Sequence, residues 1–450
     1  MRAAQICQST AFMLFPPNLS FFHVYFVSKF MGVLLRDAAS VDREIERAIE
    51  ADLELHNRSI NLIASENYPS VSVRRAMSTH LTTKYAHGYP GHRDFQGCEN
   101  LDEIEALANE RAKKLFQVEH SNVQPHTGSS ANLAAYFALL NPGDTILTLS
   151  MTSGGHISYG TPWNISGRVF KTVNYEVSSR TGLIDMDNVR DNARKCRPKL
   201  IVAGASAYPR LFDYKAFREI ADEVGAFLVA DIAHISGMVA AGVTPSPAAY
   251  ADVITTSTHK TLRGPRGGAI FSKAAHAKAI DRAVFPGSQG GPLMHVIAAK
   301  AIALHEALQP EFRSYQEQVQ KNARALAEAL KKRGFAVATG GTDNHSVNIY
   351  LEGAPFARTS LTDAEAETLC ASTGIWLNKL SFLKEYGEYF GPKGLRMGVA
   401  AMTTRGMREN EMDQISELLK KIFQKPEDEH HLATLHGHVE EIVRSFPIPQ

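Results

Sequence analysis

A lysine and an aspartate each follow an apolar segment of the chain, in positions that suit joint chemistry. Lys260 comes after the apolar run 253–255 and before a loop rich in Gly, Pro and Arg. A lysine held among cations loses its proton more readily and can act as a Schiff-base nucleophile. Asp231 ends the apolar run 227–230, and the intervening segment is long enough for one strand–helix–strand crossover. We therefore expect the carboxylate and the amine on neighbouring strand ends, facing a ligand crevice.

Two further segments offer contacts for a phosphate and for an aromatic ring. The Gly/Ser/Thr turn within 124–132 leads into a helix predicted over 133–140. Free N–H groups and hydroxyls at a helix N-terminus can hold a phosphate, although many ordinary helix caps look the same. His156 follows Gly154 and Gly155 after another predicted strand and is placed to stack on a nitrogen heterocycle. An amine, a carboxylate and a phosphate turn together match pyridoxal 5′-phosphate (PLP).

The elements that must position these residues alternate along the chain. Short apolar runs typical of buried strands cover 145–150, 200–203, 227–230 and 253–255. Helices are predicted over 41–53, from a cap formed by Asn100 and Glu103, over 214–224 before Gly225, over 315–333 before Gly334, and from about Met407. The alternation predicts a mostly parallel sheet covered by helices on both faces. After residue 310 a long charged helix, short strands and another helix follow, and this change of pattern predicts a smaller C-terminal α+β domain.

Composition bounds the class of protein. With 450 residues, 44% of them hydrophobic, the chain can bury a large core. A formal net charge of +1 gives no general electrostatic argument for a nucleic acid or an anionic membrane as partner. The four cysteines, Cys7, Cys98, Cys196 and Cys370, lack paired spacing, which fits a reducing cytoplasm. We expect a large cytoplasmic enzyme that binds neither nucleic acid nor membrane.

The two ends of the chain carry unusual segments. Residues 1–30 contain no acidic residue, and Pro16 and Pro17 break their apolar run too early for a bilayer span or a secretory signal. We interpret this segment as a disordered extension or a mis-assigned start before Met31, with a targeting segment as the alternative. The histidines near the other end are His430, His431, His436 and His438. We interpret them as part of a solvated helix face and predict no metal site.

From about residue 41 to residue 423 the chain resembles the serine hydroxymethyltransferase family, the aldol-type branch of the fold-type I PLP enzymes. The matching motifs are NLIASEN at 61–67, KYA and GYPG within 84–91, THKTLRGPRGG at 258–268 and VFPGSQGG at 284–291. The resemblance implies an aspartate aminotransferase-like α/β fold with a mostly parallel central sheet sandwiched by helices. It divides the chain into an N-terminal helical arm (31–80), a large PLP-binding domain (81–310) and a small C-terminal α+β domain (311–450).

The same resemblance implies roles for the matched residues. Lys260 would form the Schiff base with PLP, Asp231 would pair with the pyridine nitrogen, and His156 would stack on the ring. The 3′-oxygen side of the ring would be contacted by His234 and Ser206, and the phosphate by Thr127, Gly128, Ser129 and His259.

Other matched residues are implied for the substrate. Arg396, in the stretch 394–398, would clamp the substrate carboxylate, a bidentate task that suits arginine, with Ser65 and Tyr85 also at the substrate. In the family, Tyr85 and the loop with Gly290 and Gly291 are contributed across a subunit interface, so a homodimer or homotetramer is implied.

The chain departs from the family pattern at four places, which together involve five residues. His87 stands where the family has its main acid/base glutamate, and Asp94-Phe95 replaces a Tyr-Tyr pair. Tyr159 replaces the second histidine of a Gly-Gly-His-x-x-His pattern, and Leu380 replaces a folate-contacting asparagine. We interpret all four places as serving folate or one-carbon transfer, which puts the use of tetrahydrofolate in doubt.

Three hypotheses follow for the function. In the first, these are tolerated variants and the enzyme interconverts serine and glycine with tetrahydrofolate. In the second, which we favour, a β-hydroxy amino acid is cleaved to an aldehyde and a glycine quinonoid. That quinonoid then takes a proton (an aldolase) or attacks a second aldehyde (a transaldolase, with threonine as donor). His87 would be the general base, and Phe95 and Leu380 would form an apolar aldehyde pocket. The third, a non-catalytic scaffold, conflicts with the intact Lys260, Asp231 and Arg396.

Overall fold

The structure of the chain is a computed structural model that describes residues 42–356, 360–383 and 389–449. The predictions for residues 1–30 and for Cys7 lie outside these ranges. The chain divides into two compact units, residues 1–57 and residues 58–450. In the first unit the predicted helix is confirmed as α4 (Arg43–Asn57), and the Asp42 carboxylate accepts hydrogen bonds from the N–H groups of Glu44 and Ile45. Its apolar stripe, with Ile45, Ile49 and Leu53, is exposed.

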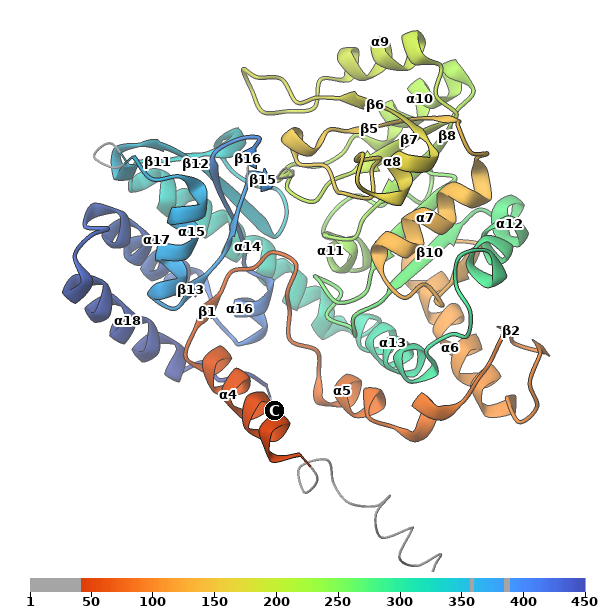
Figure 1. Cartoon of the computed structure of the whole chain (residues 1–450), viewed down its shortest axis with the longest axis horizontal. Helices are drawn as coiled ribbons and strands as arrows, with labels where there is room; N and C mark the ends of the chain where they lie inside the picture. Colours follow the sequence, from red (N-terminus) through yellow and green to blue (C-terminus); the bar gives the residue numbers. More distant parts are fainter. Residues whose placement is uncertain (1–41, 357–359, 384–388, 450) are drawn as a thin grey trace, which may run out of the picture. The chain divides into compact units, whose positions relative to one another are not determined.

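A seven-stranded sheet forms the centre of the second unit (Figure 1). In order across the sheet the strands are β4 (His120–Asn122), β10 (Gly268–Ser272), β9 (Val253–Ser257), β8 (Phe227–Asp231), β7 (Leu200–Gly204), β5 (Thr145–Leu149) and β6 (Lys171–Tyr175). The strands from β9 to β6 are parallel, and β10 is antiparallel to both of its neighbours. The predicted mostly parallel sheet and its four predicted strands are confirmed.

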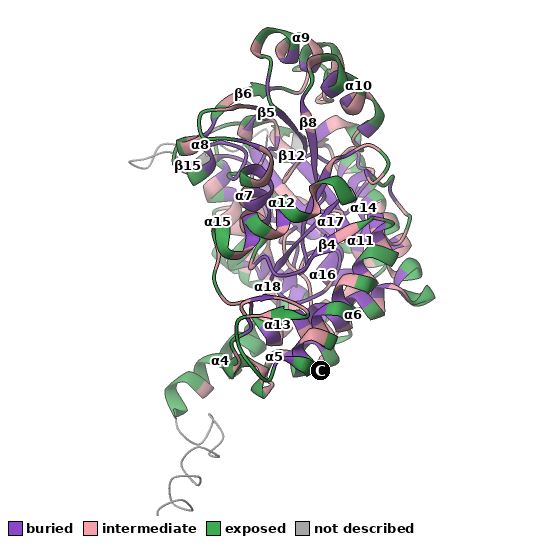
Figure 2. Ribbon diagram, turned by 90° about the vertical axis from the view of Figure 1, so that its right-hand side faces the viewer, coloured by how far each residue is buried: buried purple, intermediate pink, exposed green. Residues whose placement is uncertain are grey.

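Side chains that alternate along each strand build a separate core on either face of this sheet. Leu147, Ile201 and Leu228 pack on the face covered by α6, α9 and α10, whereas Ile146 and Val229 pack on the face covered by α7 and α12. Period-two alternation sends neighbouring residues to opposite faces. Because both faces are covered, β7, β9 and β10 are buried along their whole length, and β5 and β8 are buried from their second residue onward (Figure 2), whereas the edge strand β6 is partly exposed.

Helices connect the strands, and three of them differ from the sequence prediction at their starts. The helices of this part are α5 (Val71–Met77), α6 (Glu99–Phe116), α7 (Gly128–Leu139), α8 (Ile165–Val169), α9 (Met186–Cys196), α10 (Tyr214–Val224), α11 (Ser236–Ala240), α12 (Ala277–Arg282), α13 (Met294–Ala307) and α14 (Pro310–Lys332). The bounds predicted for α10 are confirmed, and Gly225 ends it with φ of +70°.

The cap predicted at Asn100 is wrong, because α6 begins at Glu99, directly after Cys98, which is buried in a small apolar core. Helix α14 begins five residues before the predicted start, at Pro310, since proline is well tolerated in the first helical turn. Helix α7 begins at Gly128 rather than residue 133, because Thr127 and Ser130 form a capping box.

A second, antiparallel sheet lies in the C-terminal part. Its strand order is β11 (Phe335–Val337), β12 (Ser346–Gly353), β17 (Gly394–Gly398) and β14 (Asn378–Lys379). Helices α15 (Asp363–Ser372), α16 (Ala400–Thr404), α17 (Glu409–Gln424) and α18 (Glu429–Arg444) accompany it. Strand β1 (Ile60–Asn61) pairs in parallel with β13 (Ile375–Trp376), so the segment 60–61 joins the C-terminal part of the chain. Two hairpin pairs, β2 (Gly88–Tyr89) with β3 (His92–Arg93) and β15 (Phe382–Leu383) with β16 (Tyr389–Phe390), complete the described strands.

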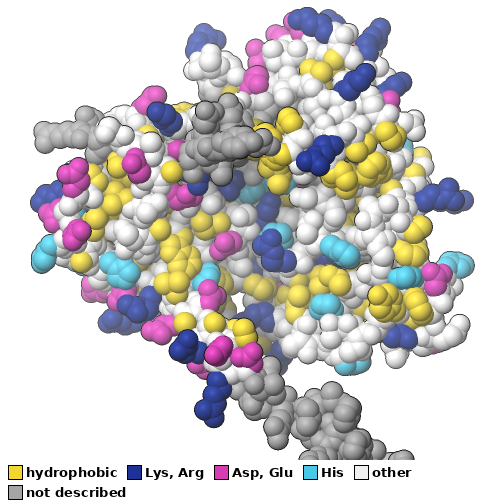
Figure 3. All heavy atoms as spheres, viewed as in Figure 1, with side chains coloured by type: hydrophobic (Ala, Val, Ile, Leu, Met, Phe, Trp, Pro, Cys, Tyr) yellow, Lys and Arg dark blue, Asp and Glu magenta, His cyan; other side chains and the backbone are white. Residues whose placement is uncertain are grey.

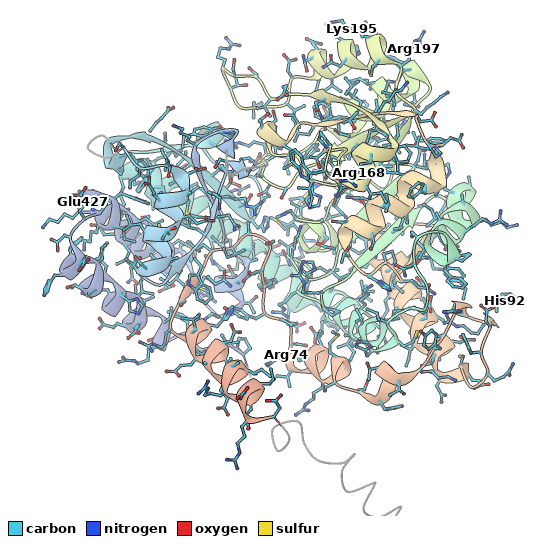
Figure 4. The ribbon with its side chains drawn as sticks, in the orientation of Figure 1. Arg74, His92, Arg168, Lys195, Arg197 and Glu427 are labelled. Atoms are coloured by element: carbon cyan, nitrogen blue, oxygen red, sulfur yellow. The ribbon has the colours of Figure 1, made fainter. Side chains whose placement is uncertain are left out.

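The surface mixes side chains of both charges (Figure 3). Lys195 and Arg197, at the end of α9, are exposed and extend away from the ribbon (Figure 4). Of the helices in the described ranges, none combines the length and the apolar character needed to cross a bilayer. In α18, His430 and His438 are exposed, and the described residues contain no cluster of three or more His, Cys, Asp or Glu side chains suited to a metal ion.

Candidate active site

A cavity of about 370 Å³ is lined by residues that directly follow β5, β7, β8 and β9. The carboxyl ends of parallel strands meet at one edge of a sheet, which is where open α/β sheets bind ligands. The predicted residues that line the cavity are Lys260, Asp231, His156, His234, Ser206, Thr127, Gly128, Ser129, His259, Arg396 and Ser65. Residues not predicted for the site also line it: Asn132, Tyr159, Ala205, Ala233, Ser257 and Arg266. Asp231 and Lys260 follow the adjacent strands β8 and β9, so their predicted proximity is confirmed.

Lys260 is 9% exposed at the base of this cavity. Burial lowers the pKa of Lys260 to about 8; the charge of Asp231 opposes this shift, whereas Arg396 and Arg266 add to it. From the sequence we expected neighbouring cations to lower the pKa of Lys260, but in the structure loss of hydration is the larger cause. At pH 7 about a tenth of the amine is therefore unprotonated, far more than for a lysine of ordinary pKa, and this is the form that acts as a nucleophile.

Asp231 is held by three hydrogen-bond donors. Its Oδ2 accepts from Asn132 Nδ2 at 2.8 Å and from the Tyr159 hydroxyl at 2.9 Å, and its Oδ1 accepts from the Ala233 N–H at 2.9 Å. A Cβ at Gly204 would lie 2.7 Å from the Tyr159 hydroxyl, so the Tyr159 side chain can approach β7 this closely only because residue 204 is glycine. Tyr159, which we linked from the sequence to folate or one-carbon transfer, is 3% exposed and supports the carboxylate proposed for the coenzyme ring.

His156 is connected to Asp231 through two side chains whose hydrogen bonds have a defined direction. The Thr255 hydroxyl donates to Asn132 Oδ1, which orients the amide so that Nδ2 donates to both Asp231 and Ser158 Oγ. The Ser158 hydroxyl then donates to His156 Nδ1, 2.7 Å away, and the Ser158 N–H donates to the same nitrogen. The proton of His156 is thereby placed on Nε2.

The charge state of His156 follows from its surroundings. Burial lowers the pKa of His156 to about 4, with the charge of Lys260 as the next largest cause. The imidazole is therefore neutral at pH 7. A neutral ring of fixed tautomer suits the predicted stacking role, because it adds no positive charge beside Lys260.

The N-terminus of α7 forms the predicted phosphate turn. The Thr127 N–H donates to Ser130 Oγ, and the Thr127 hydroxyl accepts from the Ser130 N–H at 3.0 Å, so both groups of Thr127 serve the helix cap. The N–H groups of Gly128 and Ser129, in the first helical turn, have no helical acceptor. His259 is half-buried, its Nδ1 has no partner among the described residues, and its pKa is lowered to about 3 by loss of hydration, with the charges of Lys260 and Arg266 adding. Hydrogen-bond donors thus converge at this end of the cavity.

Arg396 projects from β17 to the other end of the cavity. Its Nη1 donates to the carbonyl and the hydroxyl of Ser206, both at 3.0 Å, and its Nη2 donates to Asn378 Oδ1 at 2.9 Å. Its Nε is buried without a partner, and no carboxylate among the described residues pairs with the guanidinium. Burial lowers the pKa of Arg396 to about 10. A buried guanidinium with an unsatisfied N–H is well suited to a ligand carboxylate.

A pair of buried histidines supports the Ser206 side of the cavity. His234 Nε2 lies 3.4 Å from Ser206 Oγ, and His234 Nδ1 lies 3.4 Å from His345 Nε2, which in turn is 3.1 Å from the Ala64 carbonyl oxygen. Burial lowers the pKa of His345 to about 3 and that of His234 well below its usual value. Both rings are therefore neutral. His345 gave no signal in the sequence, since its partners come from residues 64 and 234.

Four predicted site residues lie elsewhere on the same chain. Tyr85 and His87 contact each other, with ring centroids 5.3 Å apart, and a Cβ at Gly291 would lie 3.3 Å from both side chains. Gly290 neighbours His87 as well, and Phe95 and Phe285 complete this aromatic cluster, with centroids 5.2 and 5.1 Å from His87. Tyr85 is 62% exposed. None of these residues lines the Lys260 cavity within one chain.

The predicted pairing of Phe95 with Leu380 in one aldehyde pocket is not found within a single chain. Leu380 is 7% exposed, donates its N–H to the Gly394 carbonyl at 2.8 Å and packs against Gly394 of β17. It lines a separate cavity of about 40 Å³ together with residues such as Gly154 and Tyr350. Phe95 belongs to the aromatic cluster, because β2 and β3 hold it beside His87 rather than beside β17.

The residues of the cavity fit PLP. The Lys260 amine, the Asp231 carboxylate and the free N–H groups at the start of α7 supply a partner for each reactive part of the coenzyme, and His259 keeps an unpartnered nitrogen beside them. Fold and site together define a fold-type I PLP-dependent enzyme. The family model of serine hydroxymethyltransferase matches residues 38–419. The chain belongs to the serine hydroxymethyltransferase family.

Proposed function

We propose that this chain cleaves and forms the Cα–Cβ bond of β-hydroxy amino acids without folate, as an aldolase or an L-threonine transaldolase. The observation that carries the proposal is a contrast between two parts of the molecule. Most of the residues implied for the coenzyme, together with Arg396 and Ser65, gather in one cavity. By contrast, the position implied for a folate contact is occupied by Leu380, an apolar and buried side chain beside a cavity of only about 40 Å³.

The residues of the cavity divide the work as follows. PLP, when bound, supplies an electron sink for the carbanion left when the Cα–Cβ bond breaks. Lys260 provides an amine of lowered pKa, and Asp231 is held by three hydrogen-bond donors at the position implied for the partner of the ring nitrogen. The unpartnered Nε of Arg396 and its neighbouring Nη atoms bind the α-carboxylate of the amino acid.

A base must remove the proton of the β-hydroxyl while the Cα–Cβ bond breaks and the aldehyde leaves. We assign this role to His87 of a second copy of the chain. Because His87 and Tyr85 lie in one cluster with Gly290 and Gly291, these residues reach a Lys260 cavity together in a homodimer or homotetramer. His87 Nδ1 lies 3.8 Å from the Asp94 carboxylate, which leaves Nε2 as the atom that takes the proton. The aromatic rings around His87 favour an apolar aldehyde.

The decisive experiment compares donor amino acids with and without tetrahydrofolate. We expect purified protein to convert threonine to glycine and acetaldehyde without folate, and to form new β-hydroxy amino acids when other aldehydes are supplied. Coupled acetaldehyde detection and mass measurement of the products report the two reactions. Strong folate-dependent turnover of serine with negligible turnover of threonine would refute the proposal and support the alternative, a tetrahydrofolate-dependent serine/glycine hydroxymethyltransferase.

Variants of the departing positions sharpen this comparison. Restoring only the acid, in His87→Glu, should not create folate dependence, because Leu380 still occupies its position. His87→Ala should abolish threonine cleavage while leaving coenzyme binding intact, and a matched control is His92→Ala, at an exposed position of β3. A cytoplasmic location, which the unpaired cysteines support, belongs to the same proposal.

A further inference from the structure

Lys300 is a buried lysine of α13 that has no role in the proposed Cα–Cβ cleavage. It is 2% exposed and does not line the Lys260 cavity. Its Nζ donates to the carbonyl oxygens of Val123, Pro125 and Gly268 at 2.6, 3.0 and 2.8 Å. An ammonium group has three protons, and each has its own acceptor here. A cation buried at this depth is retained only where such partners compensate for lost hydration.

The three carbonyls belong to two segments that meet at the end of β4. Strand β10 pairs with β4 as far as Asn122, and beyond it the Gly268 N–H still donates to the Pro125 carbonyl at 3.0 Å. Proline has no N–H to continue the ladder. The ammonium of Lys300 therefore replaces the strand pairing and ties residues 123–125 to the start of β10.

The contacts of Lys300 and Thr127 explain why the sequence motif has glycine at both positions 267 and 268. A Cβ at Gly267 would lie 2.5 Å from Lys300 Cε, and a Cβ at Gly268 would lie 2.2 Å from the Thr127 carbonyl oxygen. The first glycine makes room for the lysine stem, and the second lets residues 125–127 approach β10. Thr127, two residues after Pro125, caps the helix whose N–H groups form the phosphate turn.

The charge of Lys300 is also felt at this turn. Burial lowers the pKa of His126, and the charge of Lys300 is the next cause. Burial lowers the pKa of Lys300 itself to about 7, with the charge of Glu105 opposing this shift. The charged form, which the three carbonyls stabilise, favours an anionic ligand near the N-terminus of α7. Geometry and charge thus act at the same place, immediately before Gly128 and Ser129.

We propose that Lys300 is a positioning residue that holds the turn 125–129 in the conformation that binds the phosphate of the coenzyme. The inference rests on the proposed phosphate role of this turn. Lys300 touches neither coenzyme nor substrate; it acts through the carbonyls of Val123 and Pro125 and through its charge. Its effect should therefore appear in the recognition of the phosphate group rather than in the chemistry at Lys260.

The test compares two ligands that differ only in the phosphate. After removal of bound coenzyme, the full-length chain is titrated with PLP and with pyridoxal, and the two dissociation constants are measured by absorbance. We expect wild type to prefer PLP strongly, and Lys300→Met to lose at least about tenfold of that preference, since hydrogen bonds to a charged group are among the stronger ones. Binding of pyridoxal should change little.

Two further variants keep the outcome decisive. If Lys300→Met does not fold, Gly267→Ala, whose added Cβ displaces the lysine stem but keeps its charge, serves in its place. Asn322→Ala is the control: it removes a buried amide that bonds Thr403 Oγ1 and the Met407 carbonyl, far from the turn in sequence and bonded only within the C-terminal part. An equal loss of affinity for both ligands in the Lys300 and Gly267 variants, or an unchanged preference, overturns the inference. A wild type without preference for PLP instead refutes the phosphate role of the turn.

Discussion

Removal of a single hydroxyl from Tyr159 tests whether Asp231 depends on its hydrogen-bond network. The Tyr159 hydroxyl donates to Asp231 Oδ2 at 2.9 Å, and both side chains are buried. Tyr136 offers a matched control on the same face of the sheet. It is fully buried too, but its hydroxyl has no partner among the described residues. The substitutions Tyr159→Phe and Tyr136→Phe therefore remove the same atom from similar depths, with and without a partner.

The expected magnitudes follow from these contacts. A hydrogen bond to a charged group contributes about 1.5–3 kcal/mol to stability. Because Asp231 keeps its bonds to Asn132 and Ala233, we expect Tyr159→Phe to destabilise the apoprotein by about 1.5 kcal/mol, near the lower limit. Tyr136→Phe removes a hydroxyl that lost its water without gaining a partner, so we expect no loss and a gain of up to about 1 kcal/mol. Burial and then the charge of Asp231 raise the pKa of both tyrosines well above the usual range, so both stay protonated throughout the experiment.

Urea unfolding of the two variants and of wild type, followed by far-ultraviolet circular dichroism at neutral pH, measures these differences. Equal slopes in the three proteins show that the denatured states are comparable. As a second readout, Tyr159→Phe should shift the pH at which the visible absorbance of bound PLP changes, because the carboxylate beside the ring loses a donor. Tyr136→Phe should leave that pH unchanged. If the two variants lose equal stability and neither moves the spectral titration, the network around Asp231 does not have the role described above.

Two other predictions concern the cavity. Because burial lowers the pKa of Lys260 to about 8, the rate at which apoprotein takes up PLP should rise with pH and level off above about pH 8. A lysine of ordinary pKa (about 10.4) would continue to gain free amine well above that pH. Stopped-flow absorbance measures the rate, and a rate that still rises steeply at pH 10 contradicts the lowered pKa. Because the Thr127 hydroxyl caps α7, Thr127→Ala should lower the free energy of unfolding by about 1 kcal/mol while Thr127→Ser keeps it, and equal stability of the two variants in thermal unfolding would show that the cap contributes nothing.

Local sequence patterns predicted much of the large sheet and the placement of Asp231 and Lys260 at its edge. Apolar runs identified β5, β7, β8 and β9, because strands covered on both faces are apolar along their whole length. The order of β8 and β9 along the chain was enough to place Asp231 beside Lys260, since consecutive parallel strands joined by a short crossover are commonly neighbours. The start of α7 was missed, because Gly128, Ser129 and Ser130 have weak helical propensity and only the capping box marks the helix there.

The contacts of residues whose partners are distant in sequence were not predicted. Tyr159 was assigned to folate, although its hydroxyl meets a carboxylate 72 residues further along the chain. Lys300 lies in the mainly apolar helix α13, and its three acceptors lie 177, 175 and 32 residues away along the chain. Tyr85 and His87 match or replace family residues, yet they lie outside the cavity of their own chain.

The amino-acid sequence by itself determined the family, the strands of the central sheet and the identity of the groups that can contact PLP, because these depend on short motifs and on the periodicity of apolar residues. Only the tertiary structure decided which donors stabilise Asp231, that Lys260 loses its proton mainly through burial, and that Lys300 joins two backbone segments. The reason is physical, because the hydration and the hydrogen-bond partners of a side chain depend on what surrounds it in space. Strand order brings together segments that are far apart along the chain, and their sequence separation does not predict that contact.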